Sequence, residues 1–137
     1  MILQAKNLKK TFQNGEKILS VLDNISIDID KGDCVTIMGE SGVGKSTLLN
    51  ILGTLDSATS GLLLLNNEDI NDLSKDQIAE IRNKYLGFVF QFHHLLPDFT
   101  AYENVLIPNE IAGNDVDNKK AIELLAYIGL KNRMDHF

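Results

Sequence analysis

The chain has little of what secreted, membrane-spanning or nucleic-acid-coating proteins need. It has one cysteine, so no disulfide can form within it, which fits a reducing compartment. No apolar run approaches the roughly 18 residues of a membrane span, and no basic-then-apolar leader follows Met1. Acidic residues outnumber basic ones by 19 to 13, and the net charge of −6 argues against a broad nucleic-acid surface. We therefore expect a cytoplasmic protein that does not bind nucleic acid.

The length indicates one domain. A chain of 137 residues can bury a substantial core, and no Pro-, Gly- or Ser-rich linker divides it. The single cysteine, Cys34, lies in the apolar run Cys34–Met38. We expect it to be a small buried hydrophobe and not a reactive thiol.

One stretch is rich in glycine. Residues 39–47 read Gly-Glu-Ser-Gly-Val-Gly-Lys-Ser-Thr, which fits the phosphate-binding pattern G-x-x-x-x-G-K-[ST]. The run Cys34–Met38 before it is typical of a strand. Behind it, apolar residues recur at helical spacing, at Leu48, Leu49, Ile51, Leu52 and Leu55. The motif therefore has the strand-loop-helix setting that a phosphate-binding loop needs.

The pattern has a physical reason. Its glycines accept positive φ and carry no Cβ, so successive backbone N–H groups can turn toward a phosphate. A helix starting near Lys45 adds unpaired N–H donors and a positive dipole end. We predict that Lys45 reaches the β- and γ-phosphates, that Ser46 completes the shell of a Mg²⁺ ion, and that Thr47 lies on the α-phosphate side. The predicted nucleotide-binding residues of the loop are Gly39, Glu40, Ser41, Gly42, Val43, Gly44, Lys45, Ser46 and Thr47.

Antiparallel strands are expected ahead of this loop. Residues 2–8 read as a strand, 13–16 as a turn, and 18–22 and 25–29 as two further strands. Small nucleotide kinases and GTPases usually open with the phosphate loop, so this long preface disfavours them. Phe12, at the end of the first strand, either stacks on an adenine ring, a contact worth about 1–3 kcal/mol, or caps the small sheet. The residues alone leave both readings open.

The segments behind the loop alternate between strands and helices. A short strand over 62–65 ends at Asn66, which stands where a magnesium-binding carboxylate would be needed, so we expect it to be ordinary core. A capping box at Ser74 and Gln77 starts a helix that runs to about residue 84. Leu86–Phe90 then reads as a buried strand that delivers Gln91 to a loop.

The last third of the chain is predicted to be helical. Thr100 and Glu103 form a second capping box, and Pro108 is expected to interrupt or kink the helix that follows. A final helix is expected from about Asp117 and is ended by Gly129. Its predicted buried face consists of Ala121, Leu124, Leu125 and Ile128.

Two adjacent histidines, His93 and His94, invite a metal hypothesis. Neighbours on an extended loop point to opposite sides, and no Cys or His with suitable spacing is nearby. An apolar loop flanked by histidines fits a patch that docks a partner protein better.

Taken together, these residues resemble the nucleotide-binding domain of ATP-binding cassette (ABC) transporters. The resemblance rests on the loop at 39–47, the upstream aromatic Phe12 and Gln91 at the end of an apolar run. Residues 88–105, FVFQFHHLLPDFTAYENV, are most similar to the ATP-binding proteins of lipoprotein-releasing systems (the LolD type), within the group of macrolide exporters and cell-division cassettes.

The resemblance implies a fold and a division of the chain. The fold would be an α/β P-loop NTPase with an N-terminal antiparallel β subdomain over about residues 1–33. A Walker A strand-loop-helix would cover about 34–55, and the Q-loop with the start of a helical subdomain about 86–137.

It also implies roles. Gln91 would be the Q-loop glutamine that touches Mg²⁺ and the attacking water, so Lys45 and Gln91 are the expected catalytic residues. Phe12 would match the adenine-stacking aromatic, which is usually Tyr in the family. Residues 91–104, with His93, His94, Leu95, Leu96 and Phe99, would receive the membrane-spanning permease.

The resemblance further implies the activity of the complete protein. It would be an ATPase that dimerises around two ATP molecules on the cytoplasmic face of the inner membrane and drives the release of lipoproteins. The signature LSGGQ, the Walker B aspartate, the catalytic glutamate and the switch histidine of the family do not occur in these 137 residues. We therefore expect an N-terminal part that binds MgATP without hydrolysing it. Its run at 34–38 would expose unpaired backbone, favouring dimerisation, strand exchange or aggregation.

Two other functions compete with a transport ATPase. A nucleotide kinase of the guanylate-kinase type carries a similar loop but needs an Arg-rich acceptor site, and only Arg82 and Arg133 are present. A soluble cassette ATPase of DNA repair or translation is disfavoured by the acidic balance and by the segment 88–105. The transported substrate does not follow from the sequence, because substrate contacts in this architecture belong to the membrane partners.

Overall fold

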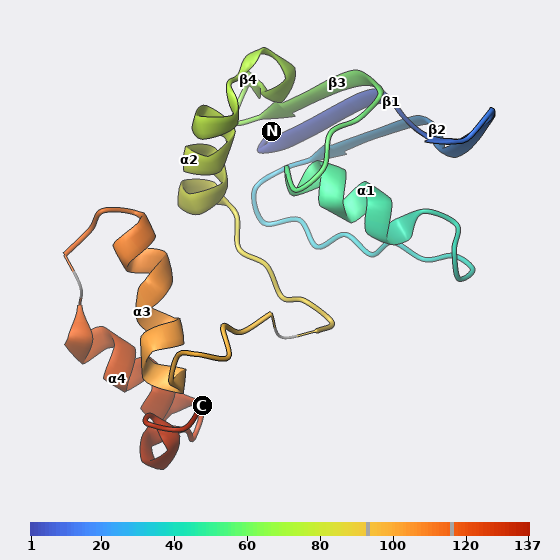
Figure 1. Cartoon of the computed structure of the whole chain (residues 1–137). Helices are drawn as coiled ribbons and strands as arrows, with labels where there is room; N and C mark the ends of the chain where they lie inside the picture. The colour runs from blue at the N-terminus through green and yellow to red at the C-terminus, as the bar shows by residue number, and fades with distance from the viewer. Residues whose placement is uncertain (93, 116) are drawn as a thin grey trace. The chain divides into compact units, whose positions relative to one another are not determined.

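The computed structural model describes residues 1–92, 94–115 and 117–137. The chain divides into a first unit, Met1–Arg82, and a second unit, Asn83–Phe137, and each is described by itself. Along the chain (Figure 1) the elements are β1 (Leu3–Asn14), β2 (Lys17–Ile29), α1 (Lys45–Leu52), β3 (Ser60–Leu65), β4 (Glu68–Asp69), the 3-10 turn η1 (Ile70–Asp72), α2 (Lys75–Tyr85), α3 (Ala101–Ile111), α4 (Asn118–Tyr127) and the 3-10 turn η2 (Lys131–Arg133).

The first unit is built on a four-stranded antiparallel sheet in the order β2-β1-β3-β4. β1 and β2 form one long hairpin, with Leu3 opposite Ile29 and Asn14 opposite Lys17. Its turn contains Gly15 at φ +62°, a conformation that glycine adopts without strain. The two strands predicted over 18–22 and 25–29 are one strand, because irregularities in the β1–β2 register let the chain bend without leaving the sheet.

The core of the first unit lies between this sheet and α1, which Figure 1 shows against one face of the strands. α1 buries Leu48, Ile51 and Leu52. The sheet contributes the buried side chains Leu3, Ala5, Leu8, Leu22, Leu63 and Leu65. The expected strand at 62–65 is therefore confirmed as core, whereas Leu49 and Leu55 of the predicted helix face are exposed.

Two predicted strands are wrong. Cys34–Met38 forms no strand, and Cys34 is exposed and unpaired instead of buried. Leu86–Phe90 forms none either, and Val89 is fully exposed. A strand exists only where its N–H and C=O groups meet a neighbouring strand. Within residues 1–92, 94–115 and 117–137 neither run has such a neighbour, so an apolar composition alone does not make it a strand.

The second unit is helical. Thr100 caps α3, and the predicted capping box with Glu103 is present. The helix continues through Pro108 to Ile111, so the proline does not interrupt it. α4 packs beside α3 in this unit, and the phenol of Tyr102 donates a hydrogen bond to Asn118 Oδ1 at 2.9 Å.

The buried face of α4 is narrower than predicted. Ala121 and Leu125 are buried, but Leu124 and Ile128 are exposed. The stretch after α4 is tied to the start of α3, because the N–H of Ala101 donates to the carbonyl of His136 at 2.8 Å. Among the described residues no helix has the length and hydropathy of a membrane span.

Candidate functional site

The glycine-rich loop passes close to the sheet where it enters α1. Gly44 has φ +103°, and a Cβ there would lie 2.9 Å from the carbonyl oxygen of Val21 and 3.1 Å from Leu22 Cδ2. Both the backbone conformation and the close approach require glycine. Gly42, also at positive φ, has open space around it. The predicted loop therefore packs its last glycine directly against β2.

The N-terminus of α1 presents unused donors. No side chain caps it, and its first turn has no acidic residue. Leu48 N–H donates to the Gly44 carbonyl at 2.9 Å, but within the described part of the chain the N–H groups of Lys45, Ser46 and Thr47 have no acceptor. A helix end with three open donors and a positive dipole end is a suitable anion site. The donor set therefore fits a phosphate.

The ammonium of Lys45 lies over the loop. Its Nζ donates to the carbonyl oxygens of Gly39 at 2.9 Å and Glu40 at 2.6 Å. These contacts fold the side chain back from the helix to the start of the loop. The loop that leads to the open N–H groups thus carries a positive charge at its start, which favours an anionic ligand.

Phe12 lies on the strand pair that the loop contacts. It pairs with Leu19 of β2, three residues from Leu22, which corresponds to about 10 Å along the strand. The ring is 43% exposed, so part of it is open to a ligand. The structure therefore brings Phe12 and residues 39–47 into one unit.

Gln91 belongs to the second unit, where it is exposed and follows residues 86–90, which form no regular secondary structure. In that segment the rings of Phe88 and Phe90 stack at 5.4 Å, and Phe90 meets His94 edge-on at 4.9 Å. The apolar side chains exposed around it are Phe92, Leu95, Leu96 and Phe99. His93, part of the predicted docking patch, lies outside the described residues.

Asn104 organises the loop after this segment, a role that the sequence reasoning missed. Its Oδ1 accepts from the N–H of Leu96 at 2.9 Å. Its Nδ2 donates to the carbonyls of Leu96, Phe99 and Thr100 at 3.0–3.1 Å. The signal available was an asparagine in the first turn of a helix, where it disfavours the helix unless its side chain is used elsewhere.

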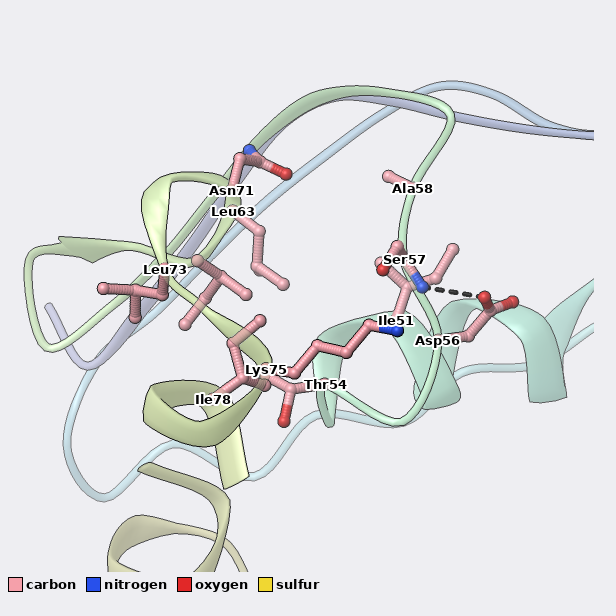
Figure 2. A pocket seen from close by; sticks show the side chains of 11 residues that line it. Ile51, Thr54, Asp56, Ser57, Ala58, Leu63, Asn71, Leu73, Lys75 and Ile78 are labelled. Carbon is pink, nitrogen blue, oxygen red and sulfur yellow. Dashed lines mark hydrogen bonds between the residues drawn. The ribbon is translucent and has the colours of Figure 1, made fainter. Parts of the chain in front are cut away.

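A cavity of about 330 Å³ lies behind α1 in the first unit, and the reasoning from sequence did not foresee it. Figure 2 shows side chains from α1, the turn after it, β3 and α2 gathered around it. Thr54 on its wall is a β-branched residue at φ +59°, a strained conformation. Its hydroxyl is buried without a hydrogen-bond partner in the described part of the chain.

Comparison with known proteins assigns the chain to a protein family. The family model for ABC transporters matches residues 22–137, which is most of the chain. The chain therefore belongs to the ABC transporter family. This membership removes the kinase reading and confirms the predicted P-loop, ABC-type fold class.

Individual relatives sharpen the comparison. The chain is 46% identical over 138 residues to the lipoprotein-releasing system ATP-binding protein LolD of Legionella pneumophila (strain Lens), covering 99% of this chain and 61% of the relative. It is 47% identical over 140 residues to LolD of Shewanella frigidimarina (strain NCIMB 400), covering 98% and 57%. The chain thus spans about 60% of the length of these relatives.

Solved structures of ATP-binding cassettes also match this chain. A dimeric, post-hydrolysis state of the ATP-binding cassette MJ0796 bound to ADP and Pi matches with a TM-score of 0.90 and 40% identity, covering 98% of this chain and 60% of that one. Another dimeric structure of MJ0796, described as a bacterial ABC transporter cassette, matches with a TM-score of 0.88, covering 97% and 60%.

Proposed function

We propose that this chain is the ATP-binding part of an ABC transporter of the lipoprotein-releasing kind and holds MgATP on residues 39–47. The carrying observation is the set of open N–H donors at the start of α1, together with the Lys45 ammonium held on the Gly39 and Glu40 carbonyls of the same loop. Its similarity to LolD proteins over nearly its whole length supports the transport class. A DNA-repair or translation ATPase is the less favoured alternative.

Within this proposal each residue has a distinct task. The loop N–H groups and Lys45 hold the β- and γ-phosphates, Thr47 lies on the α-phosphate side, and Phe12 stacks on the adenine. The hydroxyl of Ser46 and the amide of Gln91 are the proposed Mg²⁺ ligands, and Gln91 also orients the attacking water. When bound, Mg²⁺ neutralises phosphate charge.

The complete protein would hydrolyse ATP as a homodimer on the cytoplasmic face of the inner membrane. Its permease would dock on residues 91–104, which carry exposed Leu95, Leu96 and Phe99. We propose that the chain is divided into three regions. The antiparallel region covers about 1–33, the phosphate-binding element about 34–55, and the Q-loop with the helical region about 86–137. Residues 1–137 alone would hold ATP without cleaving it.

Calorimetric titration of the 137-residue chain with MgATP tests the site. We expect Lys45→Ala to weaken binding by about 10- to 100-fold, because a charge-assisted contact is lost. Lys6→Ala is the matched control, since Lys6 is an exposed lysine of β1 in the same unit. Equal affinity in the wild type and Lys45→Ala would contradict the proposal.

A steady-state phosphate-release assay tests the proposal that residues 1–137 alone do not hydrolyse ATP. The wild-type chain should show no turnover above the Lys45→Ala background. Turnover that depends on Lys45 would show that residues 1–137 are sufficient for hydrolysis and would overturn that claim.

A further inference from the structure

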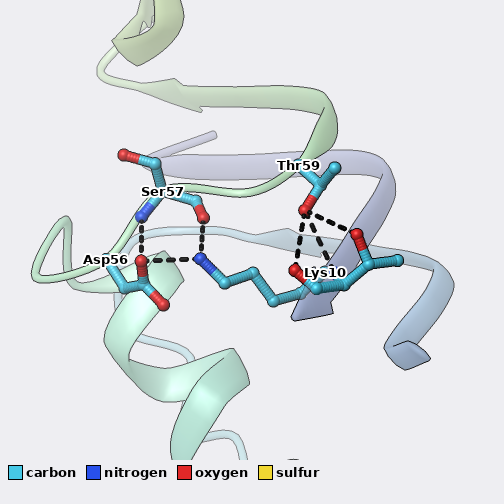
Figure 3. A network of polar contacts seen from close by, with 5 residues as sticks. Lys10, Asp56, Ser57 and Thr59 are labelled. Atoms are coloured by element: carbon cyan, nitrogen blue, oxygen red, sulfur yellow. Dashed lines mark hydrogen bonds and ion pairs between the residues drawn. The ribbon is translucent and has the colours of Figure 1, made fainter. Parts of the chain in front are cut away.

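Lys10 of β1 contacts the turn that follows α1 (Figure 3). Its Nζ donates to Asp56 Oδ1 at 2.7 Å and to the Ser57 carbonyl at 2.6 Å. The same ammonium lies 5.0 Å from the centroid of the Phe12 ring. Its side chain is only 12% exposed, so these contacts hold it in one position. One cation therefore ties the predicted base-stacking ring to the turn that follows α1.

Further hydrogen bonds fasten the same turn to β1. The N–H of Thr11 donates to Thr59 Oγ1 at 3.0 Å, and the N–H of Thr59 donates to the carbonyl of Lys9 at 2.8 Å. The end of β1 that carries Phe12 is thus joined to the turn that follows the C-terminal end of α1. The opposite end of α1 begins at the phosphate-binding loop.

The register of β1 against β2 also links Lys10 to the glycine-rich loop. Lys10 pairs with Leu22, and Leu22 is one of the two residues that Gly44 packs against. The ring at Phe12, the loop at Gly44 and the turn at Asp56 are therefore fixed to one another through Lys10 and its neighbours. A base and a phosphate of one nucleotide need such a fixed spacing.

The charge of Lys10 is paired with a carboxylate. Asp56 lies in contact with the ammonium, and the pKa of its carboxyl is lowered mainly by the hydrogen bond from Lys10. The pair is therefore neutral as a whole near pH 7. Lys9, the adjacent lysine, is a useful contrast, because it is half exposed and pairs with the exposed Asp23 at 3.0 Å. A ligand effect confined to Lys10 would not reflect the general positive charge of β1.

We propose that Lys10 is a positioning residue for the nucleotide base: it holds the Phe12 ring at a fixed place relative to the phosphate-binding loop. The inference rests on the proposed function, because it concerns the same nucleotide site. It assigns Lys10 an effect on recognition of the base and none on recognition of the phosphates.

Calorimetric titrations of the full chain with MgATP and with magnesium tripolyphosphate, which has no base, separate the two effects. Lys10→Met should weaken MgATP binding by about three- to tenfold and leave tripolyphosphate binding unchanged. Adding Lys10→Met to Phe12→Ala should cause no further loss. Lys9→Met is the matched control and should bind both ligands as the wild type does.

A second variant keeps the test decisive if Lys10→Met alone does not fold, since that change leaves the Asp56 carboxylate without its partner. Lys10→Met combined with Asp56→Asn removes both charges and should show the same selective loss of MgATP affinity. An equal loss for both ligands, or no loss for either, would overturn the proposal. A wild-type chain that binds neither ligand would instead refute the proposed function, and this inference with it.

Discussion

The two units of the chain differ in how they use their apolar residues. The first unit contains all but two of the buried apolar side chains in the described residues, and the exceptions are Ala121 and Leu125 of α4. In the second unit α3 buries no residue, and Phe92, Leu95 and Leu96 are exposed. The sequence is apolar in both places. The difference shows that burial depends on finding a partner element and not on composition.

The first unit finds its partners within the chain. β1 and β2 are joined by a two-residue turn, and β3 returns to β1 after α1 has covered the sheet. The apolar run at 86–90 has no such local return, because it is followed by a loop and a helix. We therefore expect the first unit to hold the stable core, while the second depends on α3–α4 contacts and on the hydrogen bonds of Asn104.

The largest effect that separates the units is expected from core truncation. Ile51→Ala removes a side chain that is 1% exposed and should cost about 2–5 kcal/mol of unfolding free energy. Hydrogen exchange should then rise across β1, β2 and β3. Leu125→Ala, the matched truncation in α4, should raise exchange in α3 and α4 and leave the sheet protected. If each variant lost protection to a similar extent in both units, the expectation that each truncation affects only its own unit would be wrong.

Thr54→Gly should stabilise the first unit by about 1 kcal/mol. It relieves a strained positive φ and removes a buried hydroxyl without a partner, and both gains exceed the entropic cost of glycine. Arg82 Nη1 donates to the backbone carbonyl of Thr54 at 2.9 Å, so that contact remains. Urea unfolding measures the change. Thr36→Gly, at an exposed site, is the control and should not stabilise.

Asn104→Ala should lower the free energy of local opening in the second unit by about 1–2 kcal/mol, because the Asn104 side chain closes the loop over 96–100. Amide exchange should rise at Leu96 and Thr100, whose loop the Asn104 side chain closes. Asn109→Ala, later in the same helix, is the control. Unchanged exchange at residues 96–100 would exclude the proposed role of Asn104.

The smallest expected effect concerns acid titration. The pKa of Asp56 is lowered mainly by the hydrogen bond from Lys10, and that of Glu103 by the backbone N–H and then the hydroxyl of Thr100. A lowered pKa contributes stability above the ordinary carboxyl value near 4, and the contribution is lost as pH falls through the lowered value. Carboxyl NMR should show that Lys10→Met raises the pKa of Asp56 and leaves Glu103 unchanged. A raised pKa at both carboxyls would contradict separate causes.

Much of the local structure could be predicted from sequence. The glycines of 39–47 and the apolar spacing behind them predict a loop that enters a helix, and α1 begins at Lys45. The Thr100–Glu103 capping box predicts the start of α3, and Gly15 marks the hairpin turn. Each signal is carried by residues only a few positions apart, so its physical cause is contained in one short segment.

Whether a run becomes a strand could not be predicted in the same way. Cys34–Met38 and Leu86–Phe90 have strand-like composition, yet neither meets a neighbouring strand within the described residues. The continuity of β2 through residues 23 and 24 also depends on the irregular register with β1. These outcomes depend on backbone hydrogen bonds to distant segments, which composition does not record.

The amino-acid sequence by itself determined that this protein carries the glycine-rich motif of residues 39–47, because three closely spaced glycines, a lysine and two hydroxyl residues lie within one short segment. Only the tertiary structure decided that Lys10 meets both Asp56 and Phe12, and that Thr54 lies strained on a cavity wall. Lys10 and Asp56 are 46 positions apart, so folding alone brings their charges together. In the antiparallel sheet, the β1 register and the turn after α1 decide which residues meet.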